Sequence, residues 1–218
     1  ELVPVVVGTS SQQLVGWNRN RRRADGPVDP ELIVTRIDKS GGQPLAILFH
    51  FTAHPTIMQP EHMLFSGEWP GHAQRTGEAL VGDGVTAMYY NGAEGDQSPI
   101  ARPDSGPSRW EAAERYGREL GIQAWKTWQT TATKPDVWWD YHAHSVDLPT
   151  PTWHADFLQT GGAEYGLTEN LLRLMLPLIC PSTTTSVSLR LGELVIVGVP
   201  GEATAELGLK IKSEAAQA

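Results

Sequence analysis

Apolar runs rich in β-branched residues recur along the chain, and each is closed by glycine, proline or a polar loop. Such runs are typical of β-strands. Longer segments that mix apolar and charged residues start at a capping residue and predict helices. Strands are expected at 2–10, 31–38, 44–53, 84–90, 137–149 and on both sides of Gly192, and helices at 66–80, 109–130, 168–177 and 203–216.

Local signals predict where some of these elements begin and how they connect. Ser66 is the expected N-cap of one helix, and Ser108 with Glu111 forms a capping box before the next. Strands 31–38 and 44–53 flank a short glycine-containing turn and predict a hairpin. Hairpin and crossover connections together indicate the α/β class, with a mixed β-sheet and flanking helices. No shift in composition marks a linker, so residues 1–218 are expected to form a single domain.

Composition narrows the class of protein. The net charge of -8 argues against a nucleic-acid partner, because phosphate binding needs a basic face. The one basic run, at residues 19–23, is expected to be a solvated loop. Cys180 is the single cysteine, which excludes an internal disulfide framework. No apolar run approaches the roughly 20 residues of a transmembrane helix. The sequence begins at Glu1 in a strand-like stretch, so we expect a processed chain or part of a longer one.

The stretch FHFTAHPTIM, residues 49–58, places two histidines at the end of an apolar strand. His54 is a candidate zinc ligand, because neutral imidazole is a common ligand of that metal. A histidine hydrogen-bonded within the core is the alternative. His50 cannot share a metal with His54, because four residues of extended chain separate them by about 13 Å.

Two further loops carry polar side chains where a strand ends, which is where α/β sheets commonly assemble their sites. Glu202 follows the apolar stretch LVIVGVPG and could be an oxygen ligand, a general base or a first-turn glutamate stabilised by the helix dipole. Asp96 and Ser98 lie in GAEGDQSP, which could also be a plain turn and is not the G-x-S-x-G elbow of serine hydrolases. The other histidines are expected to be structural or exposed: His62, His72, His142, His144 and His154.

Four segments in this order resemble one known family: FHFTAHPTIM, FSGEWPG, GAEGDQSP and LVIVGVPGE. Together with the early loop NRNRRRADGPVDPE, they are similar to the catalytic domain of the neutral/alkaline, non-lysosomal ceramidases. The resemblance extends from about Gly8 to Leu207. It implies an incomplete ceramidase-like catalytic domain.

The resemblance also implies a reaction and its residues. The family hydrolyses the amide of N-acylsphingosine to a fatty acid and sphingosine, with one zinc ion whose bound water attacks the amide. Carried over to this chain, His54 and Glu202 match zinc ligands, and Ser98 matches the active-site serine, as nucleophile or as donor to the scissile carbonyl. Asp96 would support the serine loop.

This sequence also departs from the family pattern. Ala93, Gln97 and Ile100 replace residues usual around the serine, and Glu68 replaces an aspartate. The remaining zinc ligands, an upstream histidine and a downstream tyrosine, are expected outside this segment. We therefore expect weak zinc binding and little activity from the isolated chain.

The resemblance implies a ceramide-like lipid amide as substrate. It allows peripheral contact with a membrane surface and places the protein outside the cytoplasm, secreted or periplasmic. Two alternatives stay open. One is a non-catalytic ceramidase-like domain that binds a lipid or a protein partner. The other is a metal-free serine hydrolase using Ser98, for which the sequence indicates no histidine base.

Overall fold

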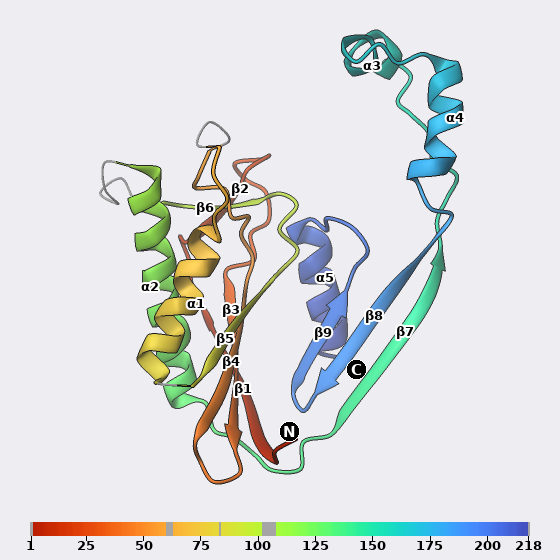
Figure 1. The fold of residues 1–218 in the computed structure, drawn as a ribbon. Coiled ribbons are helices and arrows are strands. Elements are labelled where there is room, and N and C mark those ends of the chain that lie inside the picture. The colour runs from red at the N-terminus through yellow and green to blue at the C-terminus, as the bar shows by residue number, and fades with distance from the viewer. Residues whose placement is uncertain (1, 60–62, 83, 102–107, 218) are drawn as a thin grey trace. The chain divides into compact units, whose positions relative to one another are not determined.

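The computed structural model describes residues 2–59, 63–82, 84–101 and 108–217 (Figure 1). The chain divides into two compact units. The first comprises Glu1–Asp140, Arg190–Val195 and Gly201–Ala218, and the second comprises Tyr141–Leu189 and Ile196–Pro200. The expectation of a single domain stays a prediction.

The first unit is built on a four-stranded sheet in the order β1-β3-β4-β5. β1 pairs antiparallel with β3, and β3 with β4, whereas β4 and β5 are parallel neighbours. The predicted α/β class with a mixed sheet is therefore confirmed. The strands are β1 (Val5–Gln13), β3 (Glu31–Lys39), β4 (Pro44–Phe51) and β5 (Thr86–Asn91).

Helices α1 (Glu68–Val81) and α2 (Arg109–Thr130) lie on the same side of this sheet (Figure 1). The capping box of Ser108 and Glu111 is present as predicted. α1 begins one residue later than expected, with Gly67 at the N-cap position, although the Ser66 hydroxyl still accepts the amide of Glu68 at 3.0 Å. Between sheet and helices lies the apolar core, which includes Leu32, Val34, Ile47, Phe49, Phe51, Trp69, Tyr116 and Leu120.

The two faces of β4 carry different kinds of side chain, apolar on one face and polar on the other. Phe49 and Phe51 are fully buried in the core. Because side chains alternate across a strand, His50 and Thr52 are directed to the opposite face. Both are buried polar residues, and buried polar groups are usually hydrogen-bonded.

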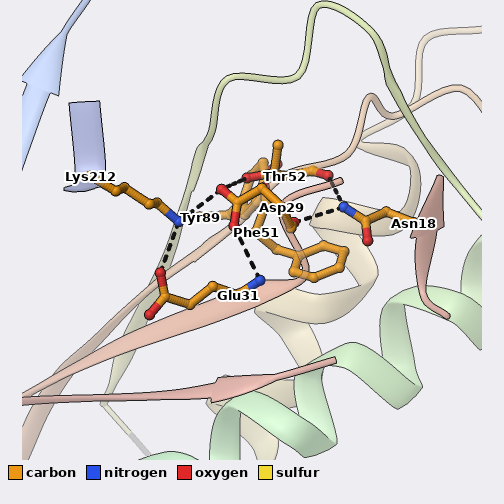
Figure 2. A network of polar contacts seen from close by, with 7 residues as sticks. All are labelled: Asn18, Asp29, Glu31, Phe51, Thr52, Tyr89 and Lys212. Atoms are coloured by element: carbon orange, nitrogen blue, oxygen red, sulfur yellow. Dashed lines mark hydrogen bonds and ion pairs between the residues drawn. The ribbon is translucent and has the colours of Figure 1, made fainter. Parts of the chain in front are cut away.

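A polar network supplies Thr52 with hydrogen-bond partners and joins the sheet to helix α5 (Ala205–Ala215) (Figure 2). Among the described residues, both ring nitrogens of His50 are buried without a hydrogen-bond partner. Asp29 accepts a hydrogen bond from the Thr52 hydroxyl at 2.9 Å and one from the Lys212 ammonium at 2.8 Å. Lys212 also donates to Glu31 at 2.9 Å, and the Asn18 amide donates to the Thr52 carbonyl at 2.7 Å. The network therefore fixes both the exit of β4 and the position of α5.

Two short strands escaped prediction, β2 (Asn18–Asn20) and β6 (Gln97–Pro99), which pair antiparallel. The remaining strands, β7 (Trp139–Asp147), β8 (Thr183–Leu191) and β9 (Leu194–Gly198), form a sheet in that order. The other helices are η2 (Phe157–Gln159), α3 (Gly161–Glu164) and α4 (Glu169–Ile179). Within the described ranges, no helix has both the length and the apolar character needed to cross a bilayer.

Candidate active site

Three segments that carry predicted site residues meet within the first unit. β4 and β5 are parallel neighbours, so the loops that follow them leave the sheet at the same edge. The amide of His54, after β4, donates to the carbonyl of Gln97 at 3.2 Å. The amide of Gly95, after β5, donates to the carbonyl of Ala203 at 2.9 Å, in the segment that leads into α5. The structure therefore brings together the backbones that carry His54, Asp96 and Glu202.

Gly95 allows the close approach of the third segment. A Cβ at this position would lie 3.0 Å from the carbonyl oxygen of Ala203 and 3.1 Å from that of Glu202. Contacts that short are tighter than ordinary packing permits, so any larger residue would push the segment away. Glycine therefore lets the segment of Glu202 pack closely on the loop after β5, and a Cβ here would require that segment to shift by a few tenths of an ångström.

Asp96 ties the same segments together through its side chain. Its carboxylate accepts hydrogen bonds from the Asn20 amide group at 2.7 Å, the Gln97 amide group at 3.1 Å and the backbone amide of Ala205 at 2.8 Å. Ala205 is the first residue of α5, whose N-cap Thr204 makes no side-chain cap bond, so Asp96 caps the helix from a distance. Burial alone would raise the pKa of Asp96, but these hydrogen bonds outweigh it and hold the pKa below its ordinary value. Asp96 therefore ties this loop to β2 and to the start of α5. Its part in catalysis stays a prediction.

His54 faces a carboxyl group that the sequence analysis did not single out. Its Nδ1 lies 3.4 Å from Oε1 of Glu94, and the two side chains are only 15% and 10% exposed. Burial lowers the pKa of His54, and the charge of Arg21 lowers it further, whereas the charge of Glu202 acts in the opposite direction. The other ring nitrogen, Nε2, is buried and has no hydrogen-bond partner in the part of the chain that the structure describes.

Glu94 is the most perturbed carboxyl group of this site. Burial raises its pKa to about 7, and the charge of Glu202 adds to the effect, while the Asn91 hydrogen bond and the charge of Arg21 oppose it. Its Oε2 is buried without a hydrogen-bond partner. Because perturbed pKa values cluster at functional sites, Glu94 and His54 together are a candidate for one. The sequence signal that could have identified Glu94 is an acidic residue in the loop that follows a strand, two positions before Asp96.

Arg21 also belongs to the site, although its run was expected to be a solvated loop. The residue is exposed, yet its guanidinium donates to the carbonyl of Gly95 at 3.0 Å and its amide to the carbonyl of Asp96 at 2.7 Å. The positively charged guanidinium of Arg21 therefore lies next to the loop that contains Glu94. The other arginines of the run, Arg19, Arg22 and Arg23, are exposed as expected.

Ser98 lies in the centre of β6, opposite Arg19 of β2. Its neighbours Gln97 and Pro99 are buried, whereas Ser98 itself is half-buried. Among the described residues it makes no hydrogen bond to a histidine, so an activated nucleophile of the serine–histidine type is not in place there. Its role in catalysis stays a prediction.

His50 does not join this site. It is buried among Lys212, Asp29 and Glu31, and its ring packs on Tyr90 with centroids 5.1 Å apart. Burial, helped by the charge of Lys212, lowers its pKa to about 4. His50 is therefore a neutral core histidine. Of the others, His72 is half-buried, His142, His144 and His154 are exposed, and His62 lies outside the described residues.

The donors fit a zinc ion in part. Imidazole nitrogen and carboxylate oxygen are usual zinc ligands, and the buried, unpartnered Nε2 of His54 is the kind of atom that a metal satisfies. Glu202 is exposed and its charge reaches the His54 ring. In the part of the chain that the structure describes, no three histidine, cysteine or carboxylate groups are arranged to hold a metal. His54 and Glu202 stay predicted ligands.

Comparison with solved structures identifies the fold. The chain superposes on the crystal structure of neutral ceramidase from Pseudomonas aeruginosa with a TM-score of 0.71 and 19% identity, over 98% of this chain and 42% of that one. It superposes on a ceramidase complexed with C2 with a TM-score of 0.69 and 20% identity, over 99% of this chain and 45% of that one. No protein-family model and no curated protein sequence matches it. The chain therefore has the fold of a part of the neutral ceramidases, spanning less than half of their length, and the resemblance found in the sequence is confirmed at that level.

Proposed function

We propose that this chain forms part of the active site of a zinc-dependent amide hydrolase that acts on ceramide-like lipid amides. The reaction adds water across the amide of an N-acylsphingosine and releases a fatty acid and sphingosine. The fold supports a hydrolase related to the ceramidases. The observation that carries the proposal is the buried Nε2 of His54, which lacks a partner and lies where the loops after β4 and β5 meet the segment of Glu202.

The residues of the chain would divide the work as follows. His54 and Glu202 would hold the zinc ion as nitrogen and oxygen ligands. When bound, zinc lowers the pKa of a coordinated water to about 7 and polarises a carbonyl oxygen. Ser98 would donate its hydroxyl hydrogen to the oxygen of the scissile amide, where negative charge develops.

The rest of the site holds these groups in place. Asp96 and Gly95 hold the segment of Glu202, and the network around Asp29 holds the chain where β4 ends, three residues before His54. Such preorganisation matters because a polar group that is already oriented needs no rearrangement in the transition state. Further zinc ligands would come from parts of a longer protein that contains this chain.

Zinc analysis and amidase assays on such a longer protein test the proposal. We expect His54→Ala and Glu202→Ala each to abolish hydrolysis of a ceramide-like amide and to remove bound zinc. His72→Ala, which changes a histidine of α1 away from the three loops, should keep both. If His54→Ala retained full zinc content and activity, the proposal would be wrong. If the wild-type protein neither bound zinc nor hydrolysed the amide, a non-catalytic lipid-binding domain would be favoured instead.

A further inference from the structure

Among the residues that the structure describes, the ring of His54 has one side-chain partner. Nδ1 lies 3.4 Å from Glu94 Oε1, whereas Nε2 is buried and has no partner. The side chains are 15% and 10% exposed, so solvent is largely excluded from both. Within the described ranges, the polar side chain nearest to this ring is that of Glu94, and it faces Nδ1.

A histidine binds a metal through a nitrogen that carries no proton, and the partner of the other nitrogen decides which one that is. A carboxylate facing Nδ1 keeps the proton there and leaves the lone pair on Nε2. Carboxylate–histidine pairs of this kind commonly support zinc ligands. We propose that Glu94 is a positioning residue that holds His54 in the Nδ1–H tautomer and directs Nε2 to the zinc. This inference rests on the proposed function.

Glu94 is itself held in place, as a positioning residue must be. The Asn91 amide group donates to its Oε1 at 3.2 Å. Its backbone amide donates to the carbonyl of Gly92 at 2.9 Å, and its carbonyl accepts the amide of Gln97 at 2.8 Å. The carboxyl group therefore stands on a tight turn directly after β5.

The backbone of His54 is fixed from the other side. Its amide donates to the carbonyl of Gln97 at 3.2 Å, and its carbonyl accepts the indole N–H of Trp69, a fully buried residue, at 3.2 Å. With both backbones restrained, the contact between Nδ1 and Oε1 sets the rotation of the imidazole ring. Removing the carboxylate would free the ring without disturbing the core.

The first experiment measures the tautomer in the absence of zinc. In the 218-residue chain with isotope-labelled histidine, at about pH 8 where histidine is ordinarily neutral, nitrogen NMR reports the proton on Nδ1 or Nε2. We expect the Nδ1–H form of His54 in the wild type and a shift to the Nε2–H form in Glu94→Leu. Glu94→Gln, which keeps an acceptor oxygen, should retain the wild-type form, and Glu193→Leu, at an exposed carboxylate, serves as the control. An Nε2–H wild type, or no shift in Glu94→Leu, would overturn the inference.

The second experiment measures zinc affinity by chelator competition in a longer protein that contains the chain. We expect Glu94→Leu to weaken zinc binding by about 10- to 100-fold, the usual cost of losing such support, and Glu94→Gln to weaken it less. Equal losses in both variants would mean that Glu94 binds the metal directly, which contradicts a positioning role. If the wild type binds no zinc, the proposed function fails while the tautomer result still decides the role of Glu94.

Discussion

Replacing Asp96 by alanine removes the side chain that joins three parts of the candidate site. Its carboxylate accepts from Asn20, from Gln97 and from the first amide of α5, at Ala205. If the site is a set of loops held in register by this group, the loss should appear first in stability. A purely catalytic role would instead leave stability unchanged.

The magnitude follows from what each donor would lose. The amide groups of Asn20 and Gln97 each keep a second acceptor, the carbonyl of Pro27, at 3.1 Å. The amide of Ala205 would lose the cap that Asp96 provides. A hydrogen bond to a charged acceptor contributes about 1.5–3 kcal/mol, and the three bonds share one group, so their losses do not simply add. We expect Asp96→Ala to lower the free energy of unfolding by about 3 kcal/mol.

Urea denaturation near neutral pH measures this change. Asp96→Asn keeps an acceptor oxygen for Ala205 and should lose only about half as much, roughly 1–2 kcal/mol. Asp25→Ala, at an exposed loop residue, is the control and should be neutral. A loss below about 1 kcal/mol in Asp96→Ala would refute the view that Asp96 holds the site together.

Three further changes test other parts of the structure. The pKa of His50 is lowered from 6.5 to about 4 in the folded chain. As the pH falls from 6.5 to about 4, the unfolded chain therefore binds a proton at His50 that the folded chain does not. The free energy of unfolding should fall by about 3 kcal/mol over this pH range. His50→Gln should lose this pH dependence in denaturation curves. Lys212→Met leaves the carboxylates of Asp29 and Glu31 without their cation and should cost about 2 kcal/mol by the same method; a neutral result would show that the ion pairs contribute nothing. Gly95→Ala crowds the segment of Glu202 and should cost about 1–3 kcal/mol, whereas Gly41→Ala, which meets no atom within 4 Å, should not.

Much of the fold follows from local sequence signals. The alternation of apolar residues in β3, the apolar run of β4 and the glycine turn between them predict the hairpin. The capping box at Ser108 predicts the start of α2. These signals are local because strand and helix periods repeat over neighbouring residues. β2 and β6 are only three residues long, and their polar residues carry no such period, so they became visible only through their pairing.

The site was predicted only in part, for a physical reason. His54 and Glu202 stood out because each follows an apolar strand, and both remain predicted ligands. Glu94 and Arg21 appeared as ordinary polar residues in a turn and a loop. Their importance arises from burial beside His54 and from the charge near it, which depend on the parallel pairing of β4 and β5. Distances across a sheet edge are not encoded in any one segment.

A zinc-edge anomalous diffraction map, from crystals of a longer protein that contains this chain, tests the proposed zinc site most directly. We expect one strong peak about 2.0–2.2 Å from Nε2 of His54 and from a carboxylate oxygen of Glu202. A peak bound to other residues, or full zinc occupancy with either side chain turned away from the metal, would contradict it.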